Sequence, residues 1–132
     1  MIELTKDIVE QMIGHSKSEC PNEACGILGG KGSKVLTIFK MTNTDKSPSS
    51  FFMDPKEQLK VMKELRKEDM EMFGIYHSHV ASKAYPSQRD IALAFYPDIS
   101  YLIVSLSDMD NPIICSYKIR DNKIEEEKIS YV

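Results

Sequence analysis

The feature that most constrains this chain lies in residues 77–90, where two histidines, a serine and an aspartate follow the pattern His-x-His-x7-Ser-x2-Asp. Residues two apart on an extended strand project from the same face with Cα atoms about 6.6 to 6.8 Å apart. The imidazoles of His77 and His79 can therefore meet one ion. Hydrolytic zinc sites typically use three ligands from histidine and aspartate or glutamate, so His77, His79 and Asp90 predict a zinc site.

Ser87 and Asp90 also have a purely structural interpretation. A Ser-x-x-Asp in front of apolar residues is a capping box, and on its own it is most often structural. A lone histidine near the end of a strand is likewise more often structural than a ligand. The two histidines spaced for one face shift the balance toward a metal site, with Ser87 left for another role.

Length and composition indicate one globular domain covering residues 1–132. Hydrophobic residues make up 42% and charged residues 28% of the chain, which excludes global disorder. Lysine and arginine total 17 against 20 for aspartate and glutamate, and the net charge of -3 gives no footprint for nucleic acid. We therefore expect a protein that does not bind nucleic acid.

The start of the chain and its cysteines bear on location. Residues 1–7 lack the basic start and apolar stretch of a signal peptide, and no apolar run approaches the roughly 20 residues that span a bilayer. Cys20, Cys25 and Cys115 form no Cys-x-x-Cys pair, which favours a reducing compartment. We expect a soluble cytoplasmic protein without a membrane partner. A metal cluster of His15, Cys20 and Cys25 is an alternative, but its spacing matches no usual arrangement.

Apolar periodicity and capping residues predict three helices. The first runs from Thr5 to about Glu19. The second begins at Asp54–Glu57, with an N-cap, a proline at the first helical position and a capping glutamate. Its predicted apolar stripe consists of Leu59, Met62 and Leu65. The third runs from Ser87 to about Phe95.

Short apolar and β-branched runs predict the strands. Because strands and helices mix without strict alternation, we expect an α/β or α+β domain with a mixed central sheet flanked by helices. The predicted strands are Glu23–Gly30, Lys34–Met41, Phe51–Met53, Phe73–His79, Tyr101–Leu106, Ile113–Ile119 and Lys123–Tyr131.

With these residues in place, the sequence resembles the JAMM, or MPN-plus, family of zinc isopeptidases. The family signature is an upstream glutamate followed by His-x-His-x7-Ser-x2-Asp, and Glu23 occupies the place of that glutamate. The likeness covers nearly the whole chain, and it implies a cytidine-deaminase-like sandwich. It further implies that His77, His79 and Asp90 bind zinc.

The resemblance also implies catalytic roles and a substrate. Glu23 would be the general acid and base, and Ser87 would stabilise the tetrahedral intermediate. At 132 residues the chain has little room for the insertions that grip polyubiquitin in larger relatives, so a compact prokaryotic-type member is implied. Its partner would be a small ubiquitin-like or sulfur-carrier protein with a Gly-Gly tail. One departure is Val80, where the family commonly has proline.

One interpretation of a different class stays beside this one, and a further enzyme class fails on the sequence. Relatives with degenerate motifs serve as non-catalytic MPN scaffolds, although the complete motif here speaks against that role. A zinc deaminase needs His-x-Glu with Pro-Cys-x-x-Cys, which this chain lacks. The sequence leaves the oligomeric state, the identity of the carrier and the choice between peptide and isopeptide bonds open.

Overall fold

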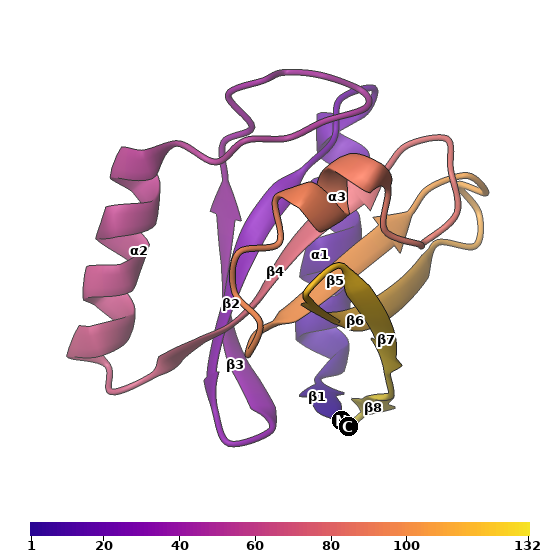
Figure 1. Ribbon diagram of the computed structural model, residues 1–132. Helices are drawn as coiled ribbons and strands as arrows, with labels where there is room; N and C mark the ends of the chain where they lie inside the picture. Colours follow the sequence, from indigo (N-terminus) through magenta and orange to yellow (C-terminus); the bar gives the residue numbers. More distant parts are fainter.

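The chain folds around one eight-stranded sheet, which the computed structural model describes over residues 1–132 (Figure 1). The strand order is β7-β6-β5-β4-β2-β3-β1-β8. β4 pairs antiparallel with β2 and parallel with β5, which confirms the predicted mixed sheet. The elements are β1 (Ile2–Leu4), α1 (Lys6–Glu19), β2 (Cys25–Lys31), β3 (Lys34–Met41), α2 (Pro55–Lys67), β4 (Glu71–His79), α3 (Gln88–Ala92), β5 (Ser100–Ser105), β6 (Ile113–Arg120), β7 (Lys123–Glu127) and β8 (Ile129–Tyr131).

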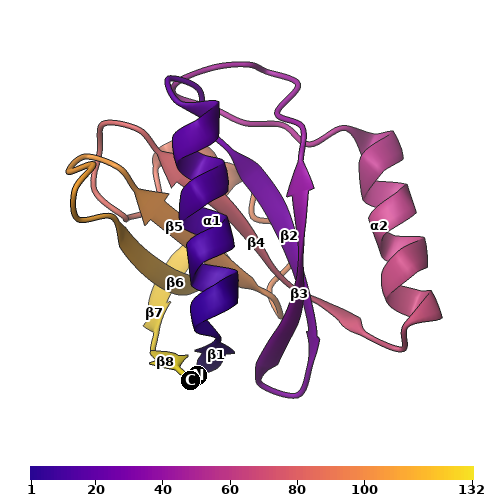
Figure 2. The same ribbon diagram turned by 180° about the vertical axis from the view of Figure 1, so that it is seen from behind.

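The sheet curls until its two ends meet. β7 and β8 stand at opposite ends of the strand order, yet only Lys128 separates them in the sequence. β8 pairs in parallel with β1, and Val132 N donates to Leu4 O at 3.0 Å, so the two termini lie side by side (Figures 1 and 2). The prediction of one strand over Lys123–Tyr131 is therefore wrong. β1 went unpredicted because three residues are too few to show a strand's alternation.

Each face of the sheet carries its own hydrophobic core, because successive strand residues point to opposite faces. On β4, Tyr76 packs on the side of α1 with Leu28 and Leu102, whereas Ile75 packs on the other side with Ile27. Figure 2 shows α1 across one face, and Figure 1 shows α2 and α3 on the side away from α1. The predicted arrangement of helices around a central sheet is confirmed.

The helix caps explain where α1 and α2 begin. Thr5 caps α1 by accepting a hydrogen bond from Ile8 N at 3.2 Å. Asp54 caps α2 by accepting from Lys56 N at 3.0 Å, and Pro55 stands at the first helical position, as predicted. None of the three helices is long and apolar enough to cross a lipid bilayer.

The predicted apolar stripe of α2 is only partly right. Val61 and Leu65 are the buried residues of this helix, and a Cβ at Gly29 would collide with Leu65, so α2 lies close against β2. Leu59 is 58% exposed. Residues three apart drift by about 60° around a helix, so the stripe through Leu59, Met62 and Leu65 turns away from the core, whereas residues four apart stay on it.

Two further predictions are corrected. Residues 51–53 form no strand and make one isolated bridge between Asn43 and Met53, because the side chain of Asn43 accepts from Phe52 N at 3.1 Å and organises the segment as a loop. α3 ends at Ala92, before the predicted Phe95. The chain leaves the helix there, and Tyr96 N donates to Tyr101 Oη at 2.9 Å instead of continuing the helical pattern.

Candidate metal centre

The two motif histidines lie at the end of β4 on the same face as Ile75. His77 and His79 are 3% and 4% exposed. In the sheet, His77 lies between Cys25 of β2 and Ile103 of β5. The pattern of alternate residues thus places both imidazoles on one buried face, as the sequence predicted.

α3 brings Asp90 to these histidines through its own capping box. Ser87 Oγ accepts from Asp90 N at 3.1 Å, and Asp90 Oδ2 accepts from Ser87 N at 2.9 Å. The structural interpretation of Ser-x-x-Asp is therefore correct. It also fixes the carboxylate where it faces His77 and His79, so the capping role and the site role coexist.

Three polar atoms converge in this cluster. His77 Nε2 and His79 Nε2 are 3.1 Å apart, and they lie 3.1 and 3.0 Å from Asp90 Oδ2. His79 Nδ1 lies 2.9 Å from Lys83 O, and since a carbonyl only accepts, Nδ1 holds the proton and Nε2 presents a lone pair. Lone pairs that point at one place repel unless a cation lies between them. The donor set therefore fits a metal ion, and the three ligand atoms lie within 4.8 Å of one another.

The close approach of these groups shifts the pKa values of Asp90 and His79. Burial alone would raise the pKa of Asp90, but without a metal ion His77 and His79 can carry a proton on Nε2, and the hydrogen bonds that these protonated imidazoles donate hold the pKa of Asp90 well below its usual range. Burial lowers the pKa of His79, yet its hydrogen bonds to Asp90 and to the Lys83 carbonyl bring the net shift upward. Asp90 is thus an anion at neutral pH, as a ligand of a cation must be.

Glu23 lies just before β2, beside the cluster. Its backbone is fixed on both sides, because Glu23 N donates to Ser47 O at 2.8 Å and Asn43 Nδ2 donates to Glu23 O at 3.0 Å. The side chain is 5% exposed, and Oε1 has no hydrogen-bond partner. Burial raises the pKa of Glu23 to about 7, partly offset by the nearby His79. A carboxyl group with this pKa can both accept and donate a proton near neutral pH.

Ser87 stands exposed at the mouth of the site. Its oxygen accepts from Asp90 N, while its hydroxyl hydrogen makes no bond within the protein. The hydroxyl can therefore donate outward. The structure thus brings together Glu23, Ser87, His77, His79 and Asp90.

The alternative metal cluster of His15, Cys20 and Cys25 does not form. His15 Nδ1 lies 2.7 Å from Tyr76 Oη, and burial raises the pKa of Cys25 to about 12, so its thiol stays protonated. All three cysteines are free. The cluster of His77, His79 and Asp90 is the one group of potential metal ligands in the structure.

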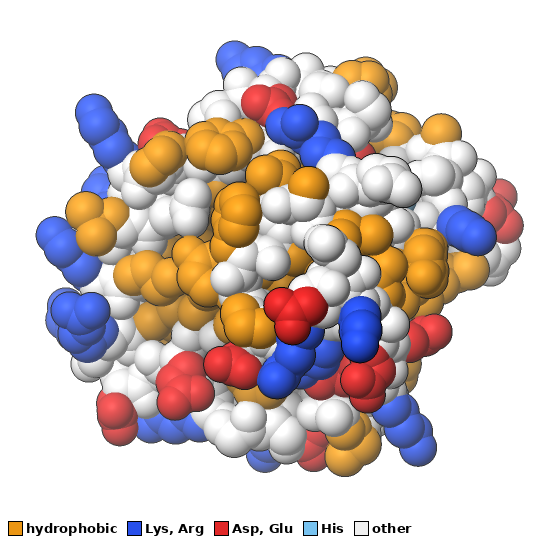
Figure 3. Space-filling model, viewed as in Figure 1, with side chains coloured by type: hydrophobic (Ala, Val, Ile, Leu, Met, Phe, Trp, Pro, Cys, Tyr) orange, Lys and Arg blue, Asp and Glu red, His pale blue; other side chains and the backbone are white.

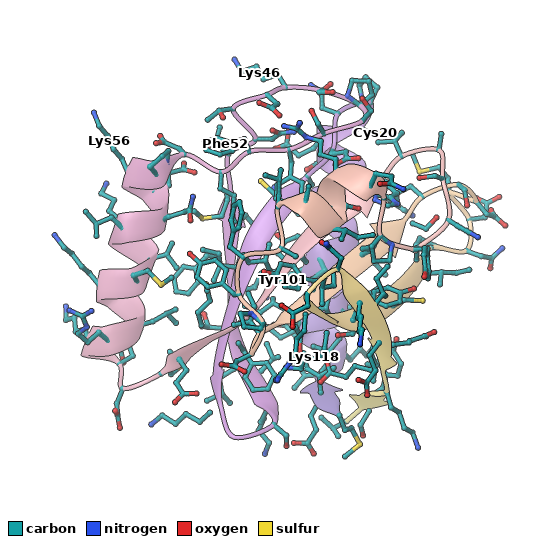
Figure 4. The ribbon with its side chains drawn as sticks, in the orientation of Figure 1. Cys20, Lys46, Phe52, Lys56, Tyr101 and Lys118 are labelled. Atoms are coloured by element: carbon teal, nitrogen blue, oxygen red, sulfur yellow. The ribbon has the colours of Figure 1, made fainter.

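Phe51 is a site residue that the sequence did not reveal. Its ring stacks on His77 with centroids 4.6 Å apart, and it lines a small cavity together with His77 and Asp90. The ring of Phe51 also lines an apolar groove with a volume of about 140 Å³, on the face shown in Figure 3. The groove is lined by Phe51, Phe52, Met53, Gln58, Ile75, Leu93, Phe95, Tyr96 and Tyr101, of which Figure 4 labels Phe52 and Tyr101.

Comparisons with known proteins agree with this geometry. Residues 5–118 match the family model described as prokaryotic homologs of the JAB domain. The CysO-cysteine peptidase of Mycobacterium tuberculosis is 40% identical over 128 residues, which cover 96% of this chain and 88% of the relative. The desampylase of Pyrococcus furiosus is 39% identical over 107 residues, which cover 81% and 74%.

Solved structures share the fold. Protein DSY2949 from Desulfitobacterium hafniense superposes with a TM-score of 0.91 at 43% identity, covering 100% of this chain and 93% of that one. A structure described as a JAMM metalloprotease-like zinc site in the proteasome and signalosome has a TM-score of 0.64 at 18% identity, covering 100% and 98%, and this likeness concerns the fold alone. The predicted resemblance and enzyme class are confirmed: the chain belongs to the prokaryotic JAB-domain family and is a peptidase.

Proposed function

We propose that this protein is a zinc-dependent peptidase or isopeptidase that hydrolyses the amide bond after the C-terminal glycine of a ubiquitin-like or sulfur-carrier protein. The observation that carries the proposal is the convergence of His77 Nε2, His79 Nε2 and Asp90 Oδ2 beside the unpartnered Oε1 of Glu23. The three ligand atoms are arranged to hold a cation, and the Glu23 carboxyl beside them is free to accept and donate a proton. We place the activity in the cytoplasm, in one domain formed by residues 1–132.

The donor set supports zinc as the ion. Two imidazole nitrogens and one carboxylate oxygen are common ligands of catalytic zinc, which keeps a further position for water or substrate. When bound, zinc would polarise the scissile carbonyl and lower the pKa of the attacking water to about 7. The contribution of the chain is to fix His79 through Lys83 O and His77 through the ring of Phe51.

Glu23 moves the proton in the proposed reaction. Oε1 is buried and unpartnered, so it can accept the proton of the attacking water without first giving up another bond. The same carboxyl then donates this proton to the departing amine nitrogen, which cannot leave as an anion. The raised pKa of Glu23, about 7, suits both steps.

Ser87 stabilises the negative oxygen that develops on the scissile carbonyl. Its oxygen already accepts from Asp90 N, which orients the hydroxyl hydrogen away from the helix. A single donor of this kind has been worth about 10² to 10³ in turnover in other hydrolases. The role needs only a hydroxyl, so threonine should replace serine there.

The substrate class is proposed from the relatives and from the groove. Similar proteins are named CysO-cysteine peptidase and desampylase, and we infer the substrate class of this protein from theirs. Glycine at the cleavage point would let the substrate backbone approach the metal closely, since it carries no side chain. The apolar groove that shares Phe51 with the site offers a surface for the folded body of the carrier.

The test is hydrolysis of a carrier adduct by the zinc-loaded protein. We expect mass spectrometry to show the host's Gly-Gly-ended carriers released from an amine attached to their last glycine, while short unstructured peptides are cut poorly. Rapid cleavage of unstructured peptides without cleavage of any carrier adduct would contradict the substrate class. Full zinc binding without any hydrolysis would favour the scaffold instead.

A further inference from the structure

The loop of residues 80–86 joins the two elements that carry the metal ligands (Figure 1). His79 ends β4 directly before this loop, and Ser87 and Asp90 belong to the first turn of α3 directly after it. Surface loops are usually the more mobile parts of a fold. The position of Asp90 relative to His79 therefore depends on how firmly the loop is held against the sheet.

Three successive carbonyl groups of this loop accept hydrogen bonds from side chains of the sheet. The middle carbonyl orients a metal ligand, and the carbonyls on either side of it accept from hydroxyl groups. Because Lys83 O lies between two carbonyls that are held in this way, the two hydroxyls fix its position as well. The three pairs are Ser105 Oγ with Ser82 O at 2.6 Å, His79 Nδ1 with Lys83 O at 2.9 Å, and Tyr117 Oη with Ala84 O.

The two hydroxyl donors come from the strands that follow β4 in the sheet. Ser105 ends β5, where it is the pairing partner of His79, and Tyr117 lies in β6, where it pairs with Tyr101 of β5. Ser105 and Tyr117 are only 2% and 3% exposed. The loop is thus anchored to buried positions of the same sheet that carries His79, which keeps the loop carbonyls and the imidazole in one arrangement.

Both hydroxyl groups direct their hydrogen to the loop. Ser105 Oγ also lies 3.1 Å from Ser107 Oγ, and because the hydrogen of Ser105 points to Ser82 O, Ser107 is the donor in that pair. The ring of Tyr117 packs edge-on against Tyr85 of the loop, with centroids 5.6 Å apart. If these contacts served only to satisfy buried carbonyls, their removal would lower stability and leave metal binding unchanged.

We propose that Ser105 and Tyr117 are positioning residues of the metal site, which hold the Lys83 carbonyl where it keeps a lone pair on His79 Nε2. The inference rests on the metal site of the proposed function. A neutral imidazole has two tautomers. In the other one, Nε2 carries the proton and can donate it to Asp90 Oδ2, 3.0 Å away, so that two ligand atoms bind each other and neither is free for an ion. A fixed Lys83 carbonyl disfavours that tautomer, because the carbonyl needs a proton on Nδ1.

The experiment measures the zinc Kd of the metal-free protein by competition with a chromophoric chelator. Tyr117→Phe and Ser105→Ala should each weaken zinc binding by about tenfold, the lower end of the range for groups that orient metal ligands. Tyr76→Phe and Ser116→Ala are the matched controls and should keep the affinity. Each removes a buried hydroxyl on the opposite face of the sheet, where Tyr76 Oη lies 2.7 Å from His15 Nδ1 and Ser116 Oγ donates to Glu127 Oε1 at 2.8 Å. Denaturant unfolding of each metal-free variant verifies that the compared proteins are folded.

Nitrogen NMR of the His79 ring gives a readout that a purely structural role would not change. In the metal-free protein with neutral imidazoles, the proton should lie on Nδ1, and Tyr117→Phe and Ser105→Ala should move part of the population to Nε2, whereas the two controls should not. Equal zinc affinity of all four variants, or weaker binding with an unchanged tautomer, would overturn the inference and leave the proposed function standing. Failure of the unsubstituted protein to bind zinc would instead remove the proposed function.

Discussion

The two faces of β4 use their buried polar groups in opposite ways. On the side of α1, Tyr76 Oη lies 2.7 Å from His15 Nδ1, and Ser78 Oγ accepts from Ala24 N at 2.8 Å. A Cβ at Gly26 would collide with the Tyr76 ring, so this position is kept clear for the pair. Each of these polar groups finds a partner within the protein, as buried groups normally do.

On the side of α3, the buried polar groups do not all find hydrogen-bond partners within the protein. His79 Nε2 and Asp90 Oδ2 are acceptors directed at one place, His77 Nε2 lies 3.1 Å from each of them, and Glu23 Oε1 is buried without a partner. A buried acceptor without a donor lowers the stability of the fold. Several such acceptors at one place therefore indicate a site for a ligand from outside the chain. The comparison teaches that burial and histidine content alone do not mark a site, whereas an excess of acceptors does.

The largest expected effect tests this contrast between histidines. Protein reloaded with zinc and washed should hold one equivalent, and His77→Ala should lose most of it together with activity, because only two ligands remain. His15→Ala, on the other face, should keep its zinc. Metal analysis of the three proteins decides the matter, and full zinc retention by His77→Ala would show that the site is assigned wrongly.

The next effect separates proton transfer from metal binding. Glu23→Gln should lower turnover by about 10² to 10⁴ with zinc content unchanged, because an amide cannot accept the water's proton. Glu10→Gln, an exposed carboxylate of α1, is the control. Undiminished turnover of Glu23→Gln at full zinc content would sink the proposed mechanism.

The contrast also explains what the sequence could and could not predict. His77 and His79 were placed correctly because a two-residue spacing on a strand fixes their common face, and Asp90 because a capping box fixes its turn. These relations are local. Glu23 was placed through the family resemblance, since its approach to His79 depends on how β2 pairs with β4.

The features that escaped prediction depend on distant parts of the chain. β1 and β8 form because segments from opposite ends of the chain pair with each other beside β3, and Leu59 is exposed because the position of α2 over β2 selects Val61 and Leu65. Phe51 was missed for the same reason, because its stacking on His77 is a contact between a loop and a strand that lie apart in the sequence. No spacing within one segment records such contacts.

A smaller effect concerns Ser87. Ser87→Ala should lower turnover by about 10² through loss of the oxyanion donor. It should also cost about 1 kcal/mol of stability through loss of the helix cap, so melting is measured alongside rate. Ser87→Thr keeps the hydroxyl and should recover most of both. If threonine restored the melting temperature but not the rate, Ser87 would be a cap and no more.

The pH dependence of stability probes the unpartnered carboxyl directly. Burial raises the pKa of Glu23 from 4.5 to about 7. Between these values the folded protein holds a proton that the unfolded chain has lost, so Glu23 lowers stability as pH rises, and the full cost is present above pH 7. Metal-free Glu23→Gln should therefore be more stable than the unsubstituted protein by about 1 to 3 kcal/mol above pH 7, and no more stable at pH 4. Denaturant unfolding at both pH values measures this, and an equal difference at both would exclude titration as the cause.

The smallest effect is expected on the side of β4 that faces α1. Tyr76→Phe removes the hydroxyl partner of His15 Nδ1 and should cost about 1 kcal/mol of unfolding free energy, because a buried polar atom loses its hydrogen bond. Zinc content should stay at one equivalent, since Tyr76 points away from His77. Tyr85→Phe, whose hydroxyl makes no hydrogen bond within the protein, is the matched control and should leave stability unchanged. Loss of zinc from Tyr76→Phe would mean that the two faces of β4 are coupled, and the division between a structural and a functional face would then fail.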